Sequence, residues 1–286
     1  MNNLVYHIIR TELLDESLRL RELYRNLSKK YPSLSAEGNS KFLKKDILMH
    51  SVEIELVGLK GAEKRREKKN SERNIYNAFD WAQNNLNSEL TNEYILEVGM
   101  RVEPESNQFG YRKEDKKIQG SWKLPPSWEK VEKEMDCFLF ENSCIDEPLE
   151  KAIHAHLHIA RIHPFNDGNG RTARLIQNAI LEKNNYLPIL TSRTERKVYI
   201  DLIEEAVIAY SLAKAKTEDS QEYLQLREHL EKKELSLKEI GLCKRLALKL
   251  AIKRSEPKVQ RFYNYFAKKE IIQLRNLCDK ILMEKK

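Results

Sequence analysis

A short polar turn joins two stretches of helical periodicity near the middle of the chain, and this arrangement limits the folds open to it. The turn reads HPFNDGNGR and covers residues 163–171. Apolar side chains recur at the spacing of one helix face from 147 to 162 and again from 171 to 186. The sequence therefore predicts two consecutive helices that meet at this turn.

Helical periodicity also extends over most of the remaining sequence. The chain has 286 residues, 41% of them hydrophobic and 33% charged, with 9 Gly and 8 Pro, which is typical of helix-rich globular proteins. Further helices are predicted at 3–30, from 42 to about 60, at 74–85 and at 127–142, and two or three more from 195 onward with a break near 255–257. We expect an all-α fold.

Residues 98–126 are the exception to the helical pattern. Glycines, prolines and short β-prone pieces alternate there, which predicts a loop and a small β-hairpin. The charged run at 61–73 is predicted to be a solvated helix or loop surface.

The sequence has the features of a reduced, cytoplasmic protein. Its first residues do not resemble a secretion signal, and no apolar run approaches the roughly 18 residues of a membrane span. The cysteines lack CxxC spacing, which predicts reduced core thiols rather than disulfides or a zinc site. They are Cys137, Cys144, Cys243 and Cys278. We expect a cytoplasmic protein that does not contact a membrane.

The positive charge of the chain is concentrated near its C-terminal end. Residues 225–286 contain 17 Lys and Arg against 8 Asp and Glu, a net charge of +9, whereas the whole chain carries +7. Aromatic side chains lie among these charges at 262, 263, 265 and 266. A basic aromatic segment is compatible with nucleic acid, but no helix-turn-helix turn is visible between 256 and 286. Packing or a protein partner is favoured over nucleic acid, and the oligomeric state stays open, a homo-oligomer included.

The start of the second central helix has the features of an anion site. Backbone N–H groups without intrahelical partners and the helix dipole favour a phosphate there. Gly168 and Gly170 let phosphate oxygens approach the backbone without meeting a Cβ. Arg171 and Arg174 supply fork-shaped donors suited to a polyphosphate.

Two other side chains of the turn complement this anion site. Asp167 would repel phosphate unless a cation stands between them, and Mg²⁺ is commonly held beside phosphates in this way. His163 has an imidazole suited to take a proton from a hydroxyl near neutral pH. The segment thus combines a base, a metal ligand and a phosphate cradle.

Simpler interpretations also fit these two helices. The turn is compatible with an ordinary helix cap. On the preceding helix, Glu150, His154 and His158 share a polar face, a spacing that resembles a metal-binding stripe. Arg161 on that face would repel a cation, so the face is predicted to be solvated, and His156 is predicted to pack in the core.

The turn and the helix start resemble the active-site motif of the Fic (Fido) family, HxFx[D/E]GNGRxxR. The fixed positions are matched by His163, Phe165, Asp167, Gly168, Asn169, Gly170, Arg171 and Arg174. The resemblance implies a Fic-type helical domain in which His163 is the general base and Asp167 the Mg²⁺ ligand. Phe165 would be a buried anchor. By the same resemblance, residues 168–170 cradle the α and β phosphates, and the two arginines bind the outer phosphates.

Family members transfer AMP from ATP to a Ser, Thr or Tyr hydroxyl of a target protein and release pyrophosphate. The resemblance therefore implies a nucleotidyltransferase with ATP as cosubstrate, Mg²⁺ as ion and a target protein as partner. A phosphate-transferring branch has Lys at the position of Gly170, so the glycine favours AMP transfer. The alternative is a catalytically silent nucleotide-sensing or DNA-binding regulator with a Fic-like body, against which the retained His163 argues.

Two upstream segments resemble further parts of the family. Residues 110–126 resemble the flap that pairs with a target segment, with Lys116, Lys117 and Ile118 at its tip. The segment SVEIEL (51–56) resembles the inhibitory motif [S/T]xxxE[G/N], with Leu56 as a departure.

The resemblance also implies roles for residues in and around this inhibitory motif. Ser51 and Glu55 would belong to an inhibitory helix at about 42–60, in which Glu55 pairs with Arg174 and displaces ATP. In some relatives this glutamate also aligns a water that removes AMP from the target. Downstream, ERKVY (195–199) resembles a family segment whose tyrosine, here Tyr199, walls the nucleoside.

We expect three regions from these patterns. Residues 1–95 form an N-terminal helical region with the inhibitory helix, residues 96–220 form the Fic core with its flap and motif (163–174), and residues 221–286 form a basic helical extension.

Overall fold

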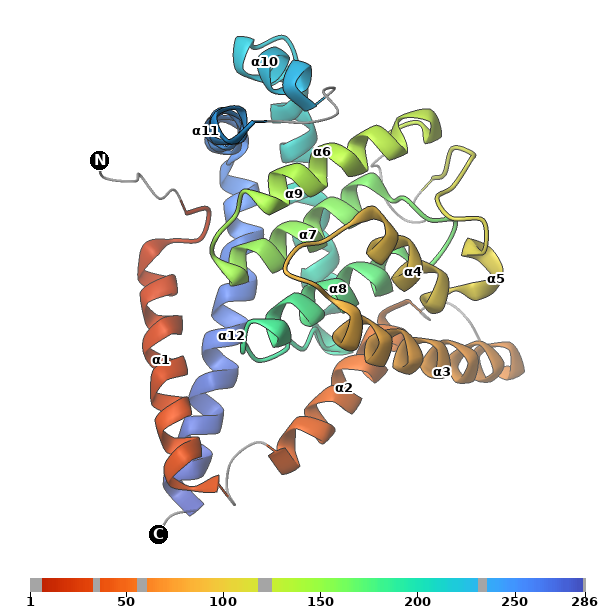
Figure 1. Ribbon diagram of the computed structural model, residues 1–286. Helices are drawn as coiled ribbons and strands as arrows, with labels where there is room; N and C mark the ends of the chain where they lie inside the picture. Colours follow the sequence, from red (N-terminus) through yellow and green to blue (C-terminus); the bar gives the residue numbers. More distant parts are fainter. Residues whose placement is uncertain (1–6, 33–36, 56–60, 118–124, 231–235, 285–286) are drawn as a thin grey trace.

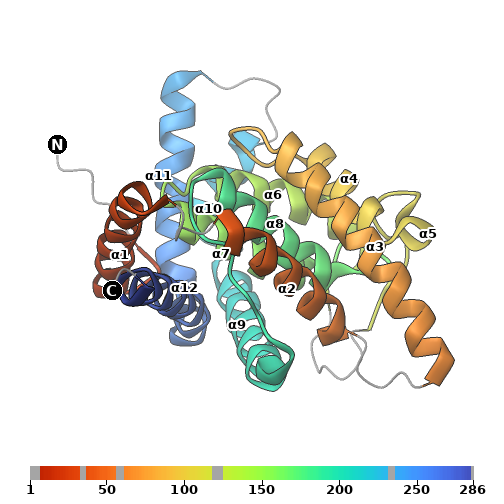
Figure 2. The ribbon, with the colours of Figure 1, turned by 90° about the horizontal axis from the view of Figure 1, so that it is seen from below.

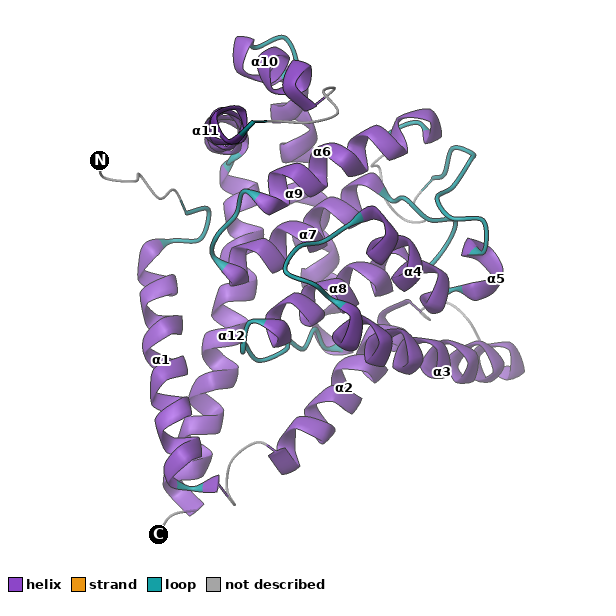
Figure 3. Ribbon diagram, viewed as in Figure 1, coloured by secondary structure: helices purple, strands orange, loops and turns teal. Residues whose placement is uncertain are grey.

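The computed structural model describes residues 7–32, 37–55, 61–117, 125–230 and 236–284, and helices dominate these ranges (Figure 3). The α-helices are α1 (Thr11–Lys30), α2 (Glu37–Glu55), α3 (Gly61–Asn85), α4 (Asn92–Val102), α5 (Pro104–Asn107), α6 (Val131–Ser143), α7 (Pro148–Ile162), α8 (Asn169–Lys183), α9 (Arg196–Thr217), α10 (Gln221–Leu230), α11 (Leu237–Arg254) and α12 (Pro257–Glu284). Two 3-10 helices, η2 (Trp128–Lys130) and η3 (Arg193–Glu195), precede α6 and α9. The predicted all-α fold is confirmed for the part of the chain that the structure describes.

The helices α7 and α8 form the centre of the molecule and pack against each other along their lengths (Figures 1 and 2). α2, α3 and α4 cover α8, whereas α6, α9 and α12 cover α7. The central pair is therefore enclosed on both sides, and the turn between its helices is held in place by the surrounding layer.

Local signals explain where the two central helices begin and end. α7 begins at Pro148, and the Glu147 carboxylate accepts a hydrogen bond from Leu149 N at 3.2 Å. α7 ends at Ile162, and the next residue, His163, has a left-handed backbone with φ 54°. α8 begins at Asn169, directly after Gly168, which is also left-handed with φ 75°. These two residues reverse the chain, so the predicted helix, turn and helix are confirmed.

The segment from 98 to 107 is helical, so the predicted loop is wrong there. α4 runs to Val102 and α5 covers 104–107. Gly99 lies inside α4. Glycine is required at this position because a Cβ would overlap the ring of Phe165, which is fully buried. The glycine that suggested a loop is thus explained by close packing of a helix.

The segment that resembles the flap is only partly described. Residues 110–117 and 125–127 form turns and loops without strand pairing, and the tip of the predicted hairpin, with Ile118, lies outside the described residues. The structure therefore describes the start and the end of this segment.

The N-terminal and C-terminal helices pack side by side, as both views show for α1 and α12 (Figures 1 and 2). Ser17 on α1 donates a 2.7 Å hydrogen bond to Glu270 on α12, in a fully buried contact. The predicted first helix, 3–30, begins at Thr11 in the structure, and the described residues before it, 7–10, are not helical. α1 is thus part of the same packed structure as the end of the chain.

From residue 195 onward the described part of the chain contains four α-helices, α9 to α12, rather than two or three, and the predicted break falls at Ser255 and Glu256. Phe262, Tyr263 and Phe266 are buried in the main core, so these aromatics pack, as favoured. The four cysteines are free thiols. No described helix combines the length and apolar character that crossing a membrane requires.

Candidate active site

The turn between α7 and α8 is held by its own asparagine. The Asn169 side chain accepts a hydrogen bond from Phe165 N and donates one to Phe165 O, both at 2.9 Å. Phe165 is fully buried, and its ring lies 5.5 Å from that of Tyr111. The turn is therefore a rigid loop anchored by one buried aromatic ring, as expected for Phe165.

The carbonyl side of the turn is held by residues outside the motif. Asn107, which is fully buried, donates hydrogen bonds to Asp167 O at 3.0 Å and to Gly99 O at 2.9 Å, and its own oxygen accepts from Asp167 N at 3.3 Å. Arg112 donates to His163 O at 2.9 Å. These contacts fix the backbone that carries His163 and Asp167.

The first turn of α8 carries the two glycines of the predicted cradle. A Cβ at Gly170 would lie 2.5 Å from Glu55 Oε1, and a Cβ at Gly168 would lie 2.9 Å from Glu103 Cγ. Because φ is 75° at Gly168, a side chain there would also strain the backbone. A carboxylate from another helix therefore lies directly beside the helix start, in the space that only glycine at 170 leaves open.

Arg174 is held by the last turns of α2. Its Nη2 donates to Glu55 Oε1 at 2.7 Å and to Ser51 O at 3.0 Å, and its Nε donates to Ser51 Oγ at 2.9 Å. Burial opposes ionisation of Glu55, but the charge and hydrogen bond of Arg174 outweigh it and lower the pKa of that carboxyl. The Glu55 side chain keeps 38% of its surface exposed, whereas Arg174 keeps 6%. The structure thus brings together Ser51, Glu55 and Arg174.

Arg171 is held by a second carboxylate. Its Nη1 donates to Glu103 Oε1 in a short ion pair and to Ser71 Oγ at 3.1 Å, and its Nη2 lies 3.6 Å from Asp167 Oδ2. Burial raises the pKa of Glu103, and the charge of Arg171 opposes that rise. Each motif arginine therefore pairs with a carboxylate from another helix or helix end.

Asp167 lies at the lip of the site with 61% of its side chain exposed. Its Oδ1 accepts a 2.6 Å hydrogen bond from Gly168 N, which orients the carboxylate. An oriented, exposed carboxylate beside an anion cradle is the donor that Mg²⁺ prefers, so Asp167 fits the predicted ion. We refer to Glu55, Glu103, Asp167, Arg171 and Arg174 as the active-site ion cluster.

Tyr199 belongs to a buried chain of hydrogen bonds behind Arg174. Its hydroxyl accepts from Arg174 Nη1 at 3.3 Å and lies 2.9 Å from His156 Nε2, while His156 Nδ1 forms a short hydrogen bond with Gln177 Oε1. Burial lowers the pKa of His156 to about 3, so the imidazole is neutral. His156 is thus a packed core residue, as predicted, and Tyr199 touches the second motif arginine.

The flap residues within the described part lie apart from these ion pairs. Lys116 Nζ donates to Glu114 Oε1 at 2.5 Å at the surface, Lys117 is exposed, and Ile118 is not described. Leu56, the departure from the inhibitory motif, also lies outside the described residues.

A second group of buried charges lies on the far side of α7, and here the sequence prediction is wrong. His154, His158 and Arg161 are buried rather than solvated, because α6 and α9 cover that face. Glu141 accepts from Arg254 Nη1 at 2.6 Å and from the Tyr210 hydroxyl at 2.9 Å. The periodicity of one helix could not reveal these covering helices.

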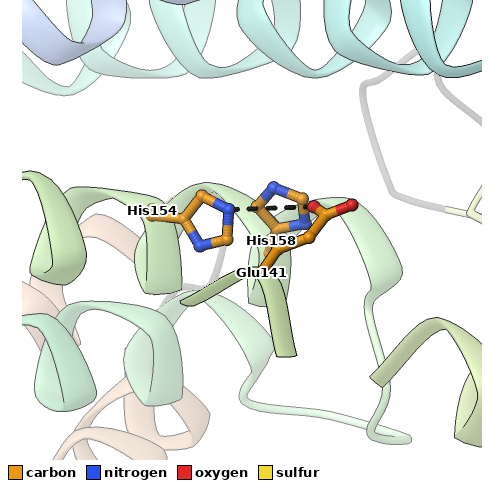
Figure 4. A group of neighbouring side chains, drawn as sticks. All are labelled: Glu141, His154 and His158. Atoms are coloured by element: carbon orange, nitrogen blue, oxygen red, sulfur yellow. Dashed lines mark ion pairs between the residues drawn. The ribbon is translucent and has the colours of Figure 1, made fainter. Parts of the chain in front are cut away.

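The donor atoms of Glu141, His154 and His158 lie within 4.8 Å of one another, close enough for a metal ion (Figure 4). Three cations also face this group, and Glu134 pairs with two of them, Arg161 at 2.6 Å and Lys214 in a short contact. A further cation would add to an existing excess of positive charge, so the geometry favours a structural network. We refer to Glu134, Glu141, Arg161, Lys214 and Arg254 as the C-terminal ion cluster.

Three residues that position the site were not identified from the sequence: Glu103, Asn107 and Arg112. Glu103 and Asn107 stand in the segment that was predicted to be a loop. Arg112 is the third residue of the segment 110–126 that resembles the flap, and this position is the signal from which a role could have been inferred.

Comparison with protein families matches residues 85–181 to the Fic/DOC family. Curated proteins named protein adenylyltransferase Fic are 39% identical to this chain, over 87 residues in Nematostella vectensis and over 66 residues in Culex quinquefasciatus. These stretches cover 29% and 23% of this chain, and 20% and 13% of the relatives. The chain therefore matches about a fifth or less of the length of these relatives.

Solved structures resemble the chain over nearly its whole length. A Fic domain containing signaling protein from Bacteroides thetaiotaomicron has a TM-score of 0.60 at 19% identity, with 93% of this chain and 97% of that chain covered. Residues 134–508 of Fic-1 from C. elegans have a TM-score of 0.59 at 17% identity, with 95% and 73% covered. These likenesses confirm the predicted Fic-type fold.

Proposed function

Because the chain carries a Fic/DOC family domain, we propose that it is a protein adenylyltransferase. It transfers AMP from ATP to a Ser, Thr or Tyr hydroxyl of a target protein. The observation that carries the proposal is the geometry of the turn, which fixes an imidazole at the end of α7 and opens an anion cradle with two arginines at the start of α8. A binding protein without catalysis has no use for the imidazole.

His163 acts as the general base of this reaction. It accepts the proton of the target hydroxyl while the hydroxyl oxygen bonds to the α phosphorus of ATP. The bond from the α phosphorus to the bridging oxygen breaks, and pyrophosphate leaves. His163 has a left-handed backbone directly after α7, six residues before the helix start that would receive the phosphates.

The start of α8 binds the triphosphate. Free N–H groups of the first turn and the side chains of Arg171 and Arg174 offer donors to its oxygens, and the glycines at 168 and 170 leave room for them. Mg²⁺, when bound by Asp167, neutralises phosphate charge. The resemblance assigns Tyr199 to the wall of the nucleoside site, and its contact with Arg174 supports a place beside the bound nucleotide.

Glu55 inhibits the enzyme from within the same chain. Its carboxylate takes the Arg174 donor and lies beside Gly170, so it occupies the position of a phosphate charge. ATP in its productive position must displace this carboxylate. The partial exposure of Glu55 supports an exchangeable contact rather than a permanent one.

We assign the catalytic unit to residues 96–220, with 1–95 supplying the inhibitory helix and 221–286 a helical extension. Target binding at the flap, through its tip at Lys116, Lys117 and Ile118, belongs to the same proposal. The contacts from Ser51 and Glu55 to Arg174 support the assignment of the inhibitory helix to residues 1–95. The pairing of Arg254 with Glu141 supports the assignment of residues 221–286 as a helical extension of the catalytic unit.

The function is tested with a His163→Ala variant made in a Glu55→Gly background. ATP binding, measured by calorimetry with Mg²⁺ present, should stay within about twofold of the parent, because the base does not touch the phosphates. Transfer of labelled AMP to protein should fall by at least about 100-fold, the lower range for loss of a general base. Equal transfer by both enzymes would contradict the role of His163.

A further inference from the structure

We propose that Arg112 is a positioning residue that locks the base of the target-binding flap and the His163 turn into one unit. The flap base is defined here as residues 110–115 and 125–127. This inference rests on the proposed function for its catalytic consequence, while its structural part stands on contacts of the described residues.

Arg112 is bonded to both ends of the flap and to the turn. Its Nη1 donates to Glu114 O at 2.9 Å, and its Nη2 donates to Pro126 O at 2.5 Å, which brings the outgoing and returning chains of the flap to one guanidinium. Its Nε donates to His163 O at 2.9 Å. A single side chain thus joins three separate pieces of backbone.

The main chain of Arg112 makes a further bond to the same turn. Its N–H donates to Pro164 O at 2.8 Å, and its Nη2 also lies 3.5 Å from Ile162 O. The carbonyls of three successive residues, 162 to 164, therefore face Arg112. His163 has φ 54°, a conformation that a non-glycine residue keeps only where its surroundings fix it, and Arg112 supplies those surroundings.

The environment of Arg112 is unusual for a cation. Its side chain is fully buried, and the nearest carboxylate, Asp115, lies 3.7 Å away with 72% of its side chain exposed. Burial lowers the pKa of Arg112, and the charge of Asp115 opposes that shift. A buried cation of this kind is costly unless every donor finds an acceptor. Backbone carbonyls provide most of these acceptors, so a shift of the flap base or of the turn leaves the guanidinium unsatisfied.

Asp115 extends the link to the helix after the flap. Its Oδ1 accepts a 2.8 Å hydrogen bond from Trp128 N at the start of η2. The flap base thus closes through Arg112 on one side and Asp115 on the other. A target segment bound at the flap would therefore be held at a fixed place relative to the imidazole of His163.

The test uses Arg112→Lys, which keeps the charge but loses the fork, with Arg21→Lys as matched control. Arg21 also donates to two carbonyls, Asn184 O and Asn185 O, far from the turn. Hydrogen exchange should rise at least about tenfold at both the flap base and residues 161–165 in Arg112→Lys, and in neither segment in the control. A rise in only one of the segments, or in neither, would overturn the proposal.

Catalysis supplies the second readout, in the Glu55→Gly background. Arg112→Lys should lower the rate of AMP transfer at saturating ATP at least about tenfold while the ATP affinity stays within about twofold, because the cradle is held by Asn169 and not by Arg112. An unchanged rate, or a loss of ATP affinity equal to the loss of rate, would contradict a positioning role. If no variant transfers AMP, the proposed function fails, whereas the exchange result still decides the link.

A measurement on the unmutated protein keeps the link testable if Arg112→Lys does not fold. The amide of Arg112 lies near the start of the flap, and the amide of Trp128 lies just after its end. The two should exchange with the same opening free energy under native conditions. Protection factors at the two amides that differ by more than about fivefold would show that the two ends move independently.

Discussion

The two ion clusters on either side of the central helices contain the same kinds of residues but differ in access to solvent. In the active-site ion cluster, Glu55 and Asp167 keep 38% and 61% of their side chains exposed. In the C-terminal ion cluster, Glu134 and Glu141 keep 16% each and Arg254 keeps 1%. Paired charges open to water can exchange partners at low cost, whereas enclosed ones cannot.

The difference in exposure distinguishes an ion pair that can exchange its partner from one that only holds helices together. We propose that a ligand replaces the Glu55 carboxylate, since 38% of that side chain is exposed. Nothing of comparable charge can reach Arg254, which also donates to Thr217 Oγ1 at 3.0 Å and so ties α11 to α9. Exposure therefore distinguishes the Glu55–Arg174 pair from the enclosed pairs, to which Glu103–Arg171 of the active-site ion cluster also belongs, with 13% and 6% of its side chains exposed.

The largest effect is expected from Glu141→Ala, which leaves Arg254 buried without its carboxylate. Removing one partner of a buried ion pair typically costs about 3–5 kcal/mol of unfolding free energy. Urea denaturation followed by circular dichroism measures the change. A loss below about 1 kcal/mol would mean that the C-terminal ion cluster contributes little to stability and that the comparison is wrong.

Acid should weaken the C-terminal ion cluster next. Burial lowers the pKa of His154 to about 4 from its ordinary value of 6.5, with Glu141 opposing the shift. The folded state therefore binds fewer protons than the unfolded chain between these values, and stability present above pH 6.5 is lost as pH falls toward 4. At about 1.4 kcal/mol per unit of pKa, the loss approaches about 3 kcal/mol.

The same urea titrations, repeated at several pH values, measure this loss. His154→Gln cannot be protonated, so its stability should change less between pH 6.5 and 4 than that of the parent. Identical slopes for the two proteins would show that His154 does not carry the acid sensitivity.

Glu55→Gly should raise AMP transfer while hardly changing stability. Coupling between a competing group and a ligand is typically worth about 1–3 kcal/mol, or roughly 5- to 150-fold, and the gain should fall in that range. Transfer of labelled AMP and thermal unfolding are measured on the same preparations. Glu53→Gln, two residues before Glu55 on α2, loses an ion pair with Lys68 on α3; it is the matched control and should leave the rate unchanged. A gain in both variants would remove the specific role of Glu55.

The smallest effect is expected where both partners are exposed. Lys197 and Asp201 form an i,i+4 pair at 2.9 Å with 89% and 57% of their side chains exposed. Lys197→Ala should change the unfolding free energy by no more than about 0.5 kcal/mol. A larger change would show that exposure is not what ranks the ion pairs of this protein.

The sequence indicated the centre of the site better than its supports. Residues of the turn and of the first helical turns after it act on one another over short distances along the chain, so HPFNDGNGR was sufficient to predict the helix, turn and helix, whereas the buried Phe165 was expected only from the resemblance to the Fic motif. Glu55 pairs with a residue 119 positions away, and it was found only through resemblance to an inhibitory motif.

The misjudged parts share a physical reason, which is that their surroundings come from distant sequence. Gly99 suggested a loop, but it lies in a helix, at a position where the ring of Phe165 leaves no room for a Cβ. The polar face with His154 and His158 suggested solvent, but α6 and α9 bury it. Glu103 and Arg112 became visible only when folding brought them to Arg171 and His163.

The central claim is that this turn transfers AMP to protein hydroxyls. Its most direct measurement is mass spectrometry of proteins incubated in cell lysate with the Glu55→Gly enzyme and isotopically labelled ATP. The account predicts Ser, Thr or Tyr side chains that carry labelled AMP, and none when His163→Ala is added. Absence of labelled protein with an enzyme that binds ATP, or equal labelling by the His163→Ala variant, would contradict it.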